Sequence, residues 1–184
     1  MNTYDRTKIG KKIAQGGDRK VYMYGDDKVI KFSRLSPFAG DKLHKKYLHD
    51  YLVCKKYFGK YIVETDNVSN LSEGDNIEIQ PFIRGEMLEK KHSNNPYIKT
   101  QLIEITKILN TMKKDGSPIV DLLGNFGMFS PRLSNIVVDS SDNLKIIDAV
   151  LLEGRSVMPF GIILEIFIPF VRARQNYLLH KFLK

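Results

Sequence analysis

The sequence has few of the residues on which several common kinds of protein depend. It contains a single cysteine, Cys54, which excludes a disulfide framework and any CxxC metal site. Its four histidines are dispersed and form no HExxH pair, which excludes a zinc protease of that type. The longest apolar stretch, residues 157–171, is shorter than the roughly 20 residues of a membrane span, and Glu165 and Pro169 interrupt it. The first twelve residues hold no apolar segment that would direct secretion, so we expect a cytoplasmic protein.

Positive charge is the first informative feature that is present. The 184 residues carry 29 Lys+Arg and 21 Asp+Glu, a formal net charge of +8. Residues 1–60 alone carry 15 basic and 6 acidic side chains, so the excess is concentrated there. Such a basic segment fits nucleic acid, an anionic membrane or a phosphorylated ligand, and it equally fits a solvated face without a dedicated partner. No RNP-type aromatic motif or zinc knuckle favours nucleic acid.

The spacing of apolar and turn residues predicts an antiparallel sheet with one helix in the first half of the chain. The glycine pair at positions 16 and 17 and the Gly-Asp-Asp sequence at 25–27 indicate turns between strands. Apolar residues that recur every three or four positions predict a helix before the next strand pair. In order, we expect strands over 9–15, 21–24 and 28–32, a helix over 39–58, and strands over 61–68 and 76–83.

The second half reads as two helices and a hairpin. Gly85 begins a polar linker that ends at Pro96. An apolar stripe predicts a helix over residues 98–113, and two β-type runs around a polar turn predict a hairpin over residues 135–148. Residues 159–183 are expected to be helical, apolar first and basic later.

Four motifs follow one another in an order that is typical of one family. They are a glycine turn between two strands, a lysine in the next strand, a strand that runs into Gln80-Pro81-Phe82, and an asparagine–hairpin–aspartate unit. In this order they resemble the protein-kinase-like fold in a minimal bacterial form, over roughly residues 9–150. The resemblance implies an α+β protein of two lobes. Residues 1–83 would form an antiparallel sheet with one helix, and residues 84–184 a truncated, mainly helical lobe.

The glycine turn is where the resemblance puts the nucleotide phosphates. Glycines there let backbone N–H groups approach phosphates without interference from a Cβ atom. Gly16, Gly17 and Val21 match the family's loop, whereas Ala14 and Arg19 stand where its other glycines would be. An ordinary hairpin turn explains the same residues.

The next two motifs would hold the rest of the nucleotide. Lys31 resembles the strand lysine that binds the α- and β-phosphates. The family pairs this lysine with a helix glutamate; no glutamate occurs over residues 39–58, and Asp50 lies at about the expected spacing. Gln80 and Phe82 lie at the hinge where adenine would stack. A lysine at a strand edge and a strand that ends in a loop are the plainer interpretations.

Asn135 and Asp148 carry the strongest part of the resemblance. In kinases an asparagine ends the catalytic loop, an aspartate lies just beyond a hairpin, and both bind Mg²⁺. Mg²⁺ prefers oxygen ligands, at least one of them anionic, and nucleotide phosphates supply the others. Asp148 lies thirteen residues after Asn135 and follows an apolar run, where a bare carboxylate is costly without a cation or donors. A turn asparagine and a strand-end aspartate are the alternative.

The position of the catalytic base is less direct. Kinases place an aspartate five residues before the asparagine, and here that residue is Ser130, which cannot accept a proton as a carboxylate does. A second alignment uses Asp121, which begins an Asp-Leu-Leu-Gly pattern, with residues 125–134 as an insertion before Asn135. We therefore expect Asp121 to be the base, with its carboxylate near the Asn135 amide. Arg132, in the insertion, would contact the γ-phosphate.

The resemblance implies a phosphotransferase that uses ATP and Mg²⁺, with Asp121, Lys31, Asn135 and Asp148 as its catalytic residues. The phosphate acceptor stays open among a protein, a sugar and a lipid headgroup. One alternative is a pseudokinase that binds a nucleotide or a partner without transfer, because Ser130 stands at the usual base position. Another is a basic protein that binds a membrane surface or nucleic acid. The helix expected over residues 159–183 either covers a core or contacts an anionic membrane from the cytoplasm.

Overall fold

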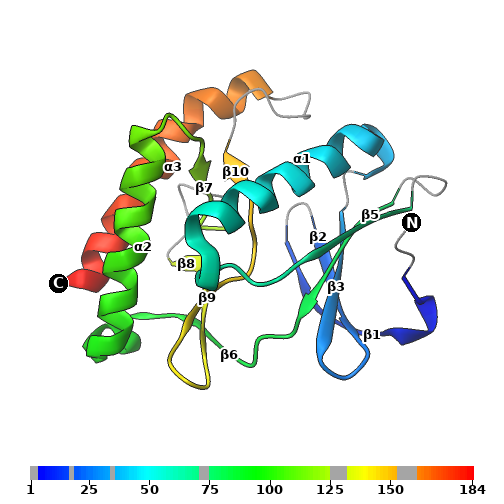
Figure 1. Ribbon diagram of the computed structural model, residues 1–184, viewed down its shortest axis with the longest axis horizontal. Helices are drawn as coiled ribbons and strands as arrows, with labels where there is room; N and C mark the ends of the chain where they lie inside the picture. Colours follow the sequence, from blue (N-terminus) through cyan, green and yellow to red (C-terminus); the bar gives the residue numbers. More distant parts are fainter. Residues whose placement is uncertain (1–3, 17–18, 34–35, 71–74, 125–131, 153–160) are drawn as a thin grey trace.

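The computed structural model describes residues 4–16, 19–33, 36–70, 75–124, 132–152 and 161–184. Within these ranges the strands form three antiparallel sheets, of five, three and two strands, and three α-helices pack on them. Figure 1 shows the five-stranded sheet at one side of the molecule, α2 and α3 at the other, and α1 across the middle. The architecture is therefore α+β, as predicted.

The five-stranded sheet is formed in the order β1-β2-β3-β5-β4. Its strands are β1 (Ile9–Gln15), β2 (Arg19–Tyr24), β3 (Lys28–Ser33), β4 (Asp66–Asn70) and β5 (Asp75–Pro81). Side chains alternate between the two faces of each strand. Ile30, Ile77 and Ile79 form an apolar cluster on one face, so Lys31 and Glu78 point to the other, which faces the rest of the molecule.

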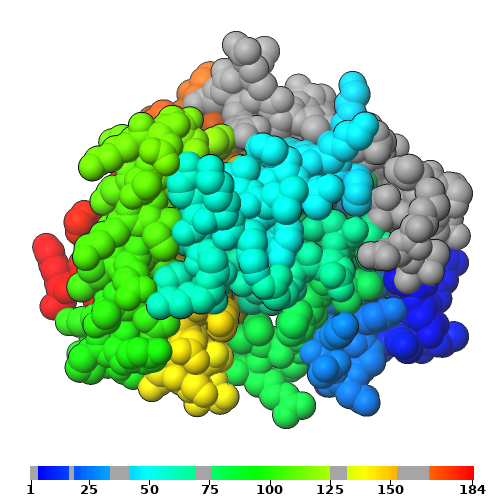
Figure 2. Space-filling view, in the orientation of Figure 1, coloured from blue at the N-terminus to red at the C-terminus, as the bar shows by residue number. Residues whose placement is uncertain are grey.

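Helix α1 (Ser36–Phe58) connects the sheet to the second half of the chain. It contacts β4, β5 and α2, and Figure 2 shows it lying between α2 and the sheet. Its buried stripe, at helical spacing, is Leu43, Tyr47, Asp50, Cys54 and Phe58. Gly59 follows with φ +49° and opens the 3₁₀ turn η2 (Gly59–Tyr61), a conformation that glycine adopts at little cost.

The second half holds the larger core. Its helices are α2 (Pro96–Lys114) and α3 (Gly161–Leu183), which contact each other. Its strands are β6 (Gly85–Leu88), β7 (Ile119–Val120), β8 (Leu133–Asp139), β9 (Leu144–Ile146) and β10 (Leu151–Leu152), and its 3₁₀ turn is η3 (Lys90–Asn94). Residues from α1, α2, α3 and these strands share one apolar cluster. Both lobes therefore meet through α1. Among the described helices, none is both long and apolar enough to cross a membrane.

Most predicted elements are confirmed, and two local predictions are wrong. The segment from Gly85 is strand β6, paired with β8, instead of a linker. A Cβ atom on Gly85 would lie 2.1 Å from the Val138 carbonyl oxygen, so only glycine lets the β6 backbone lie this close to β8. The strand expected over 61–68 begins only at Asp66, because Ile62 and Val63 leave the sheet to join Ile146 of the second half.

Candidate functional site

Four charged side chains converge where the inner face of the five-stranded sheet meets the end of the β8–β9 hairpin. Lys31 and Glu78 are directly opposite each other in the β3–β5 ladder, so their side chains share a face. Arg19 comes from β2, and Asp148 follows β9. We call Arg19, Lys31, Glu78 and Asp148 the charge cluster.

Lys31 joins the sheet to the hairpin. Its ammonium nitrogen donates to the Ile147 carbonyl oxygen at 2.5 Å. It lies 3.8 Å from Asp148 Oδ1 and 4.0 Å from Glu78 Oε2, and only 7% of the side chain is exposed. The predicted phosphate-binding lysine and the predicted metal-binding aspartate are thus in direct electrostatic contact.

Arg19 is the buried centre of the cluster. Its Nη1 lies 2.5 Å from Glu78 Oε2 and 2.6 Å from Asp148 Oδ1. Its guanidinium carbon lies 4.4 Å from the centroid of the Tyr47 ring, an arrangement that favours a cation over an aromatic face. Burying an arginine is costly unless carboxylates compensate its charge, and here two of them do. The residue that breaks the family's glycine pattern therefore holds the predicted metal ligand.

Asp50 does not make the expected pair with Lys31. Its Oδ2 lies 2.6 Å from the Lys46 ammonium, one helical turn earlier, and accepts from the Leu151 N–H at 3.1 Å. The carboxylates within 4.0 Å of Lys31 belong to Glu78 and Asp148. The prediction fails because Glu78 lies directly opposite Lys31 in the ladder. The short side chain of Asp50 instead accepts a hydrogen bond from β10. Asp50 instead ties α1 to the second half.

Asn135 organises the loop that contains Asp121. Its Nδ2 donates to the Asp121 carbonyl oxygen at 2.8 Å, and its backbone N–H donates to the Leu122 carbonyl at 3.2 Å. Its own carbonyl accepts from the Ile147 N–H at 3.0 Å. Asn135, 8% exposed, therefore fixes the Asp121 loop and the residue before Asp148 at the same time. The insertion between Asp121 and Asn135 does not separate them.

The Asp121 carboxylate is turned toward its own loop. Its Oδ1 accepts from the N–H groups of Leu123 at 2.9 Å and Gly124 at 3.2 Å. Gly124 has φ +67°, and a Cβ atom there would lie 2.9 Å from Asn135 Oδ1, so glycine permits this tight turn. The Asn135 side-chain amide contacts the Asp121 backbone carbonyl, whereas we expected it to lie beside the Asp121 carboxylate. Ser130, the other candidate position, lies outside the described residues.

Gln175 of α3 holds the same loop from the other side. Its Oε1 accepts from the Leu122 N–H at 2.9 Å, and only 2% of the residue is exposed. Reasoning from the sequence missed this residue. A glutamine within the apolar stripe of the closing helix was the available signal.

Some of the residues predicted to bind the nucleotide lie beside the charge cluster, and others lie farther along the sheet. Val21 lies opposite Lys31 in the β2–β3 ladder, and the Gly16 N–H closes the turn by donating to the Arg19 carbonyl at 2.8 Å. Gln80 is buried two residues beyond Glu78, whereas Phe82 is 40% exposed and its N–H donates to the Asp27 carbonyl at 2.7 Å. Gly17 lies outside the described residues.

Arg132 and Cys54 are not part of the charge cluster. Arg132, expected at the γ-phosphate, pairs with Glu89 at 3.3 Å. Burial, together with the Asp50 and Asp148 carboxylates, raises the pKa of the Cys54 thiol to about 12. A thiol with such a pKa is protonated near neutral pH and is a poor nucleophile. The chemistry available to the cluster is therefore that of its carboxylates, cations and amides.

Comparison by sequence found no protein-family model and no curated protein that matches the chain. Comparison of structures found protein kinases. The Lpg2603 kinase of Legionella pneumophila, solved bound to IP6, has a TM-score of 0.59 and 16% identity, over 93% of this chain and 59% of that chain. The PknI kinase domain of Mycobacterium tuberculosis has a TM-score of 0.50 and 14% identity, over 77% of this chain and 57% of that one. The chain spans less than two thirds of the length of either kinase.

Proposed function

Because the chain has a small protein-kinase-like fold, we propose that it binds ATP with Mg²⁺ and transfers phosphate to an acceptor that is a protein, a sugar or a lipid headgroup. The observation that carries the proposal is the contact of Lys31 with Asp148, 3.8 Å apart, beside a loop that Asn135 joins to Asp121. Phosphoryl transfer needs positioning and charge compensation more than covalent chemistry. These four residues provide that combination.

The donor set fits Mg²⁺ bound together with a nucleotide. A divalent cation in such a site takes one or two side-chain oxygens and several from phosphates and water. Asp148, 23% exposed at its side chain, would supply an anionic oxygen, and Asn135 an amide oxygen. The described residues contain no group of three or more His, Cys, Asp or Glu that could hold a metal alone. The bound ion would offset the charge of the phosphates.

Arg19 is paired with the carboxylate that the proposed metal site would use. Its Nη1 lies 2.6 Å from Asp148 Oδ1, where it would compete with a bound metal ion for that oxygen. Phosphate groups would offer Arg19 alternative anions and so release the carboxylate. Glu78 would keep Lys31 and Arg19 oriented during this exchange, as the helix glutamate does for the lysine in kinases.

Asp121 would receive the proton of the acceptor hydroxyl. The support is its position beside Asn135 and its carboxylate, which Ser130 lacks. Oδ1 is held by two N–H groups of its own turn, so the loop orients the group before an acceptor arrives.

The second candidate is a pseudokinase that binds a nucleotide or a partner without transfer. The observation that favours it is the Arg19–Asp148 ion pair, which keeps the proposed metal ligand occupied. Transfer of labelled phosphate from ATP, to the chain itself or to water, separates the two functions. Turnover that Asp121→Asn reduces by about 10²-fold or more, with binding of ATP retained, supports the transferase. ATP binding without turnover supports the pseudokinase.

Contact with an anionic membrane surface stays a prediction. Ile166 and Phe170 of α3 are 63% and 58% exposed, and Arg172 and Arg174 follow them. Apolar residues beside basic ones suit the interface of a membrane. Co-sedimentation with vesicles that contain phosphatidylserine, for the wild type and Phe170→Ser, would test it.

A further inference from the structure

The solvent-facing side of α1 is a continuous stripe of basic and leucine side chains. From Lys42 to the end of the helix, the exposed residues are Lys42, Lys45, Leu48, His49, Leu52 and Lys56. Each lies three or four positions from another member, so all of them share one side of the helix. Figure 2 shows α1 open on the face of the molecule that is drawn. We call these six residues the α1 stripe.

The α1 stripe carries positive charge without acidic side chains of its own. Asp50 is the only acidic residue at positions 42–58, and it is buried and paired with Lys46. No hydrogen bond or ion pair to a described residue engages Lys42 or Lys56. Like charges three or four positions apart repel each other and destabilise a helix. A negatively charged partner would remove this cost.

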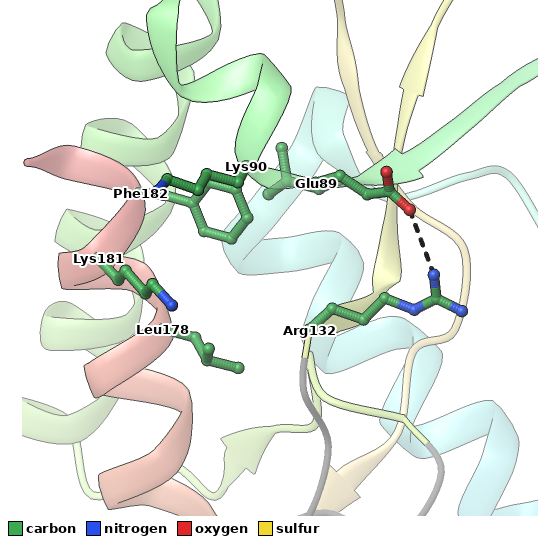
Figure 3. A pocket seen from close by; sticks show the side chains of 7 residues that line it. Glu89, Lys90, Arg132, Leu178, Lys181 and Phe182 are labelled. Carbon is green, nitrogen blue, oxygen red and sulfur yellow. Dashed lines mark hydrogen bonds and ion pairs between the residues drawn. The ribbon is translucent and has the colours of Figure 1, made fainter.

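Other basic side chains of the molecule have acidic partners within the chain. Lys55, at the flank of α1, is paired with Glu64. Beside the cavity at the end of α3, the Arg132 guanidinium is directed toward Glu89, with Nη1 3.3 Å from Oε1 (Figure 3). The α1 stripe differs from these places, because the positive charge of Lys42 and Lys56 is left for a group outside the chain.

Two leucines give the α1 stripe an apolar centre. Leu48 and Leu52 are 39% and 56% exposed and lie one helical turn apart, between Lys45 and Lys56. Removing leucine surface from water contributes roughly 25 cal/mol for each Å² that is covered. A partner that covers both leucines therefore gains from apolar contact as well as from charge.

We propose that the α1 stripe binds an acidic amphipathic helix of a partner protein. Apolar residues of that helix would cover Leu48 and Leu52, and its carboxylates would pair with the lysines on either side. Lys42 and Lys56 are fourteen positions apart, about 21 Å along a helix, so a partner helix of about four turns would span the stripe. No member belongs to the charge cluster, so the proposal does not depend on phosphotransfer.

The composition of the α1 stripe favours a protein over other anionic partners. Single-stranded nucleic acid stacks its bases on aromatic side chains, and none of the six residues is aromatic in that sense except the imidazole of His49. Phosphates would also leave the leucines uncovered. A helix that lies in a membrane surface presents a wide apolar face with large apolar or aromatic residues, whereas the apolar part here is one turn long.

Fluorescence anisotropy with a labelled peptide of four Glu-Glu-Leu-Leu repeats tests the proposal. We expect saturable binding to the wild type. Leu52→Ser removes the apolar contact, and the double variant Lys42→Gln/Lys56→Gln removes two charges. Each should weaken the affinity by about fivefold or more. All three positions are exposed, so the variants should fold.

The matched controls lie on α2. Ile103→Ser replaces an apolar residue that is 43% exposed, and Lys113→Gln/Lys114→Gln removes two exposed lysines. Both should keep the wild-type affinity. Losses as large as those of the α1 variants, or no binding of the peptide to the wild type, would overturn the proposal.

Three further measurements separate the acidic helix from other ligands. A peptide with serine in place of leucine should bind more weakly, and equal affinity would overturn the proposal. Lys31→Met should bind the peptide as the wild type does, since a loss there would move the contact to the charge cluster and overturn the assignment. Oligothymidine, or vesicles containing phosphatidylserine, should bind without dependence on Leu52. Binding of either that Leu52→Ser weakens would assign the stripe to nucleic acid or to a membrane instead.

Discussion

The contact between Arg19 and Glu78 could not be predicted from this sequence. Glu78 sits in an Asn-Ile-Glu-Ile-Gln alternation whose polar residues are as buried as its apolar ones. In a strand that pattern normally indicates one buried and one solvated face. The charge cluster explains the exception: Glu78 faces two cations, and both of its partners come from other strands. Only the strand pairing shows that these residues meet.

Replacing Glu78 should therefore destabilise the protein. Glu78→Gln leaves Arg19 and Lys31 buried with Asp148 as the carboxylate they share, and breaking a buried ion pair typically costs about 3 kcal/mol. Urea unfolding monitored by circular dichroism would measure the change in the free energy of unfolding. Glu86→Gln, an exposed glutamate paired with Lys91, is the control and should change it far less. Equal effects of the two substitutions would contradict the role given to Glu78.

Cys54 allows a prediction about pH. Burial raises the pKa of its thiol to about 12, from an ordinary value of about 9.0. Above about pH 9 the unfolded chain loses this proton while the folded chain keeps it, so stability falls as the pH rises. The thiol contributes fully below pH 9, and its contribution declines from there to about pH 12.

The pH dependence of unfolding, compared between the wild type and Cys54→Ala, measures this contribution. The wild type should lose more stability than the variant between pH 9 and 11. Parallel profiles would show that the thiol is not protected. The folded protein should also react slowly with Ellman's reagent at pH 8 and rapidly in urea.

At the scale of elements, local sequence patterns predicted the helices and strands that depend on interactions between residues near in sequence. The stripe through Leu43, Tyr47, Cys54 and Phe58 identified α1, and the turn residues identified the β1–β2–β3 meander. Strand β6 was missed because its partner among the described strands, β8, lies about fifty residues later in the chain. Nothing in its four residues distinguishes a strand from a linker. Long-range pairing was thus the part of the fold that single-sequence patterns could not supply.

The same division holds for the candidate site. Lys31, Asn135 and Asp148 were predicted because each lies in a local motif, and the structure brings Lys31 to Asp148. Gln175 lies about fifty residues from the backbone N–H that it accepts from. Its place in an apolar stripe indicates burial, but the sequence does not show which group it contacts. The partner of Lys31 was misassigned for the same reason.

Gln175→Leu should loosen the Asp121 loop. The substitution leaves the buried Leu122 N–H without its acceptor, which costs about 1–3 kcal/mol. Hydrogen exchange measured at the Leu122 amide should become faster, while the amides in the middle of α2 keep their protection. Asn176→Leu, at the next position of α3 and exposed, is the control and should leave Leu122 protected. Unchanged exchange in Gln175→Leu would show that α3 does not hold the loop.

At the scale of the whole molecule, polar contacts between described residues connect the two lobes of one small chain. Arg19 and Lys31 reach from the sheet to Asp148, Asp50 reaches from α1 to Leu151, and Val63 reaches to Ile146. Under the proposed function, a bound nucleotide would rearrange the charge cluster. The chain spans 57–59% of the length of the kinases that it resembles, and it contains the elements that carry the predicted nucleotide and metal residues.

The Mg²⁺ dependence of ATP binding tests the central claim most directly. Calorimetric titration of ATP with and without Mg²⁺ should show that Mg²⁺ strengthens binding to the wild type by about tenfold or more, because in the proposed site the ion would join Asp148 to the phosphates. In Asp148→Ala this advantage should vanish. The exposed turn variant Asp26→Ala should keep it. An Asp148→Ala variant that retains the full effect of Mg²⁺, or a wild type that does not bind ATP, would contradict the assignment of this cluster as a nucleotide and metal site.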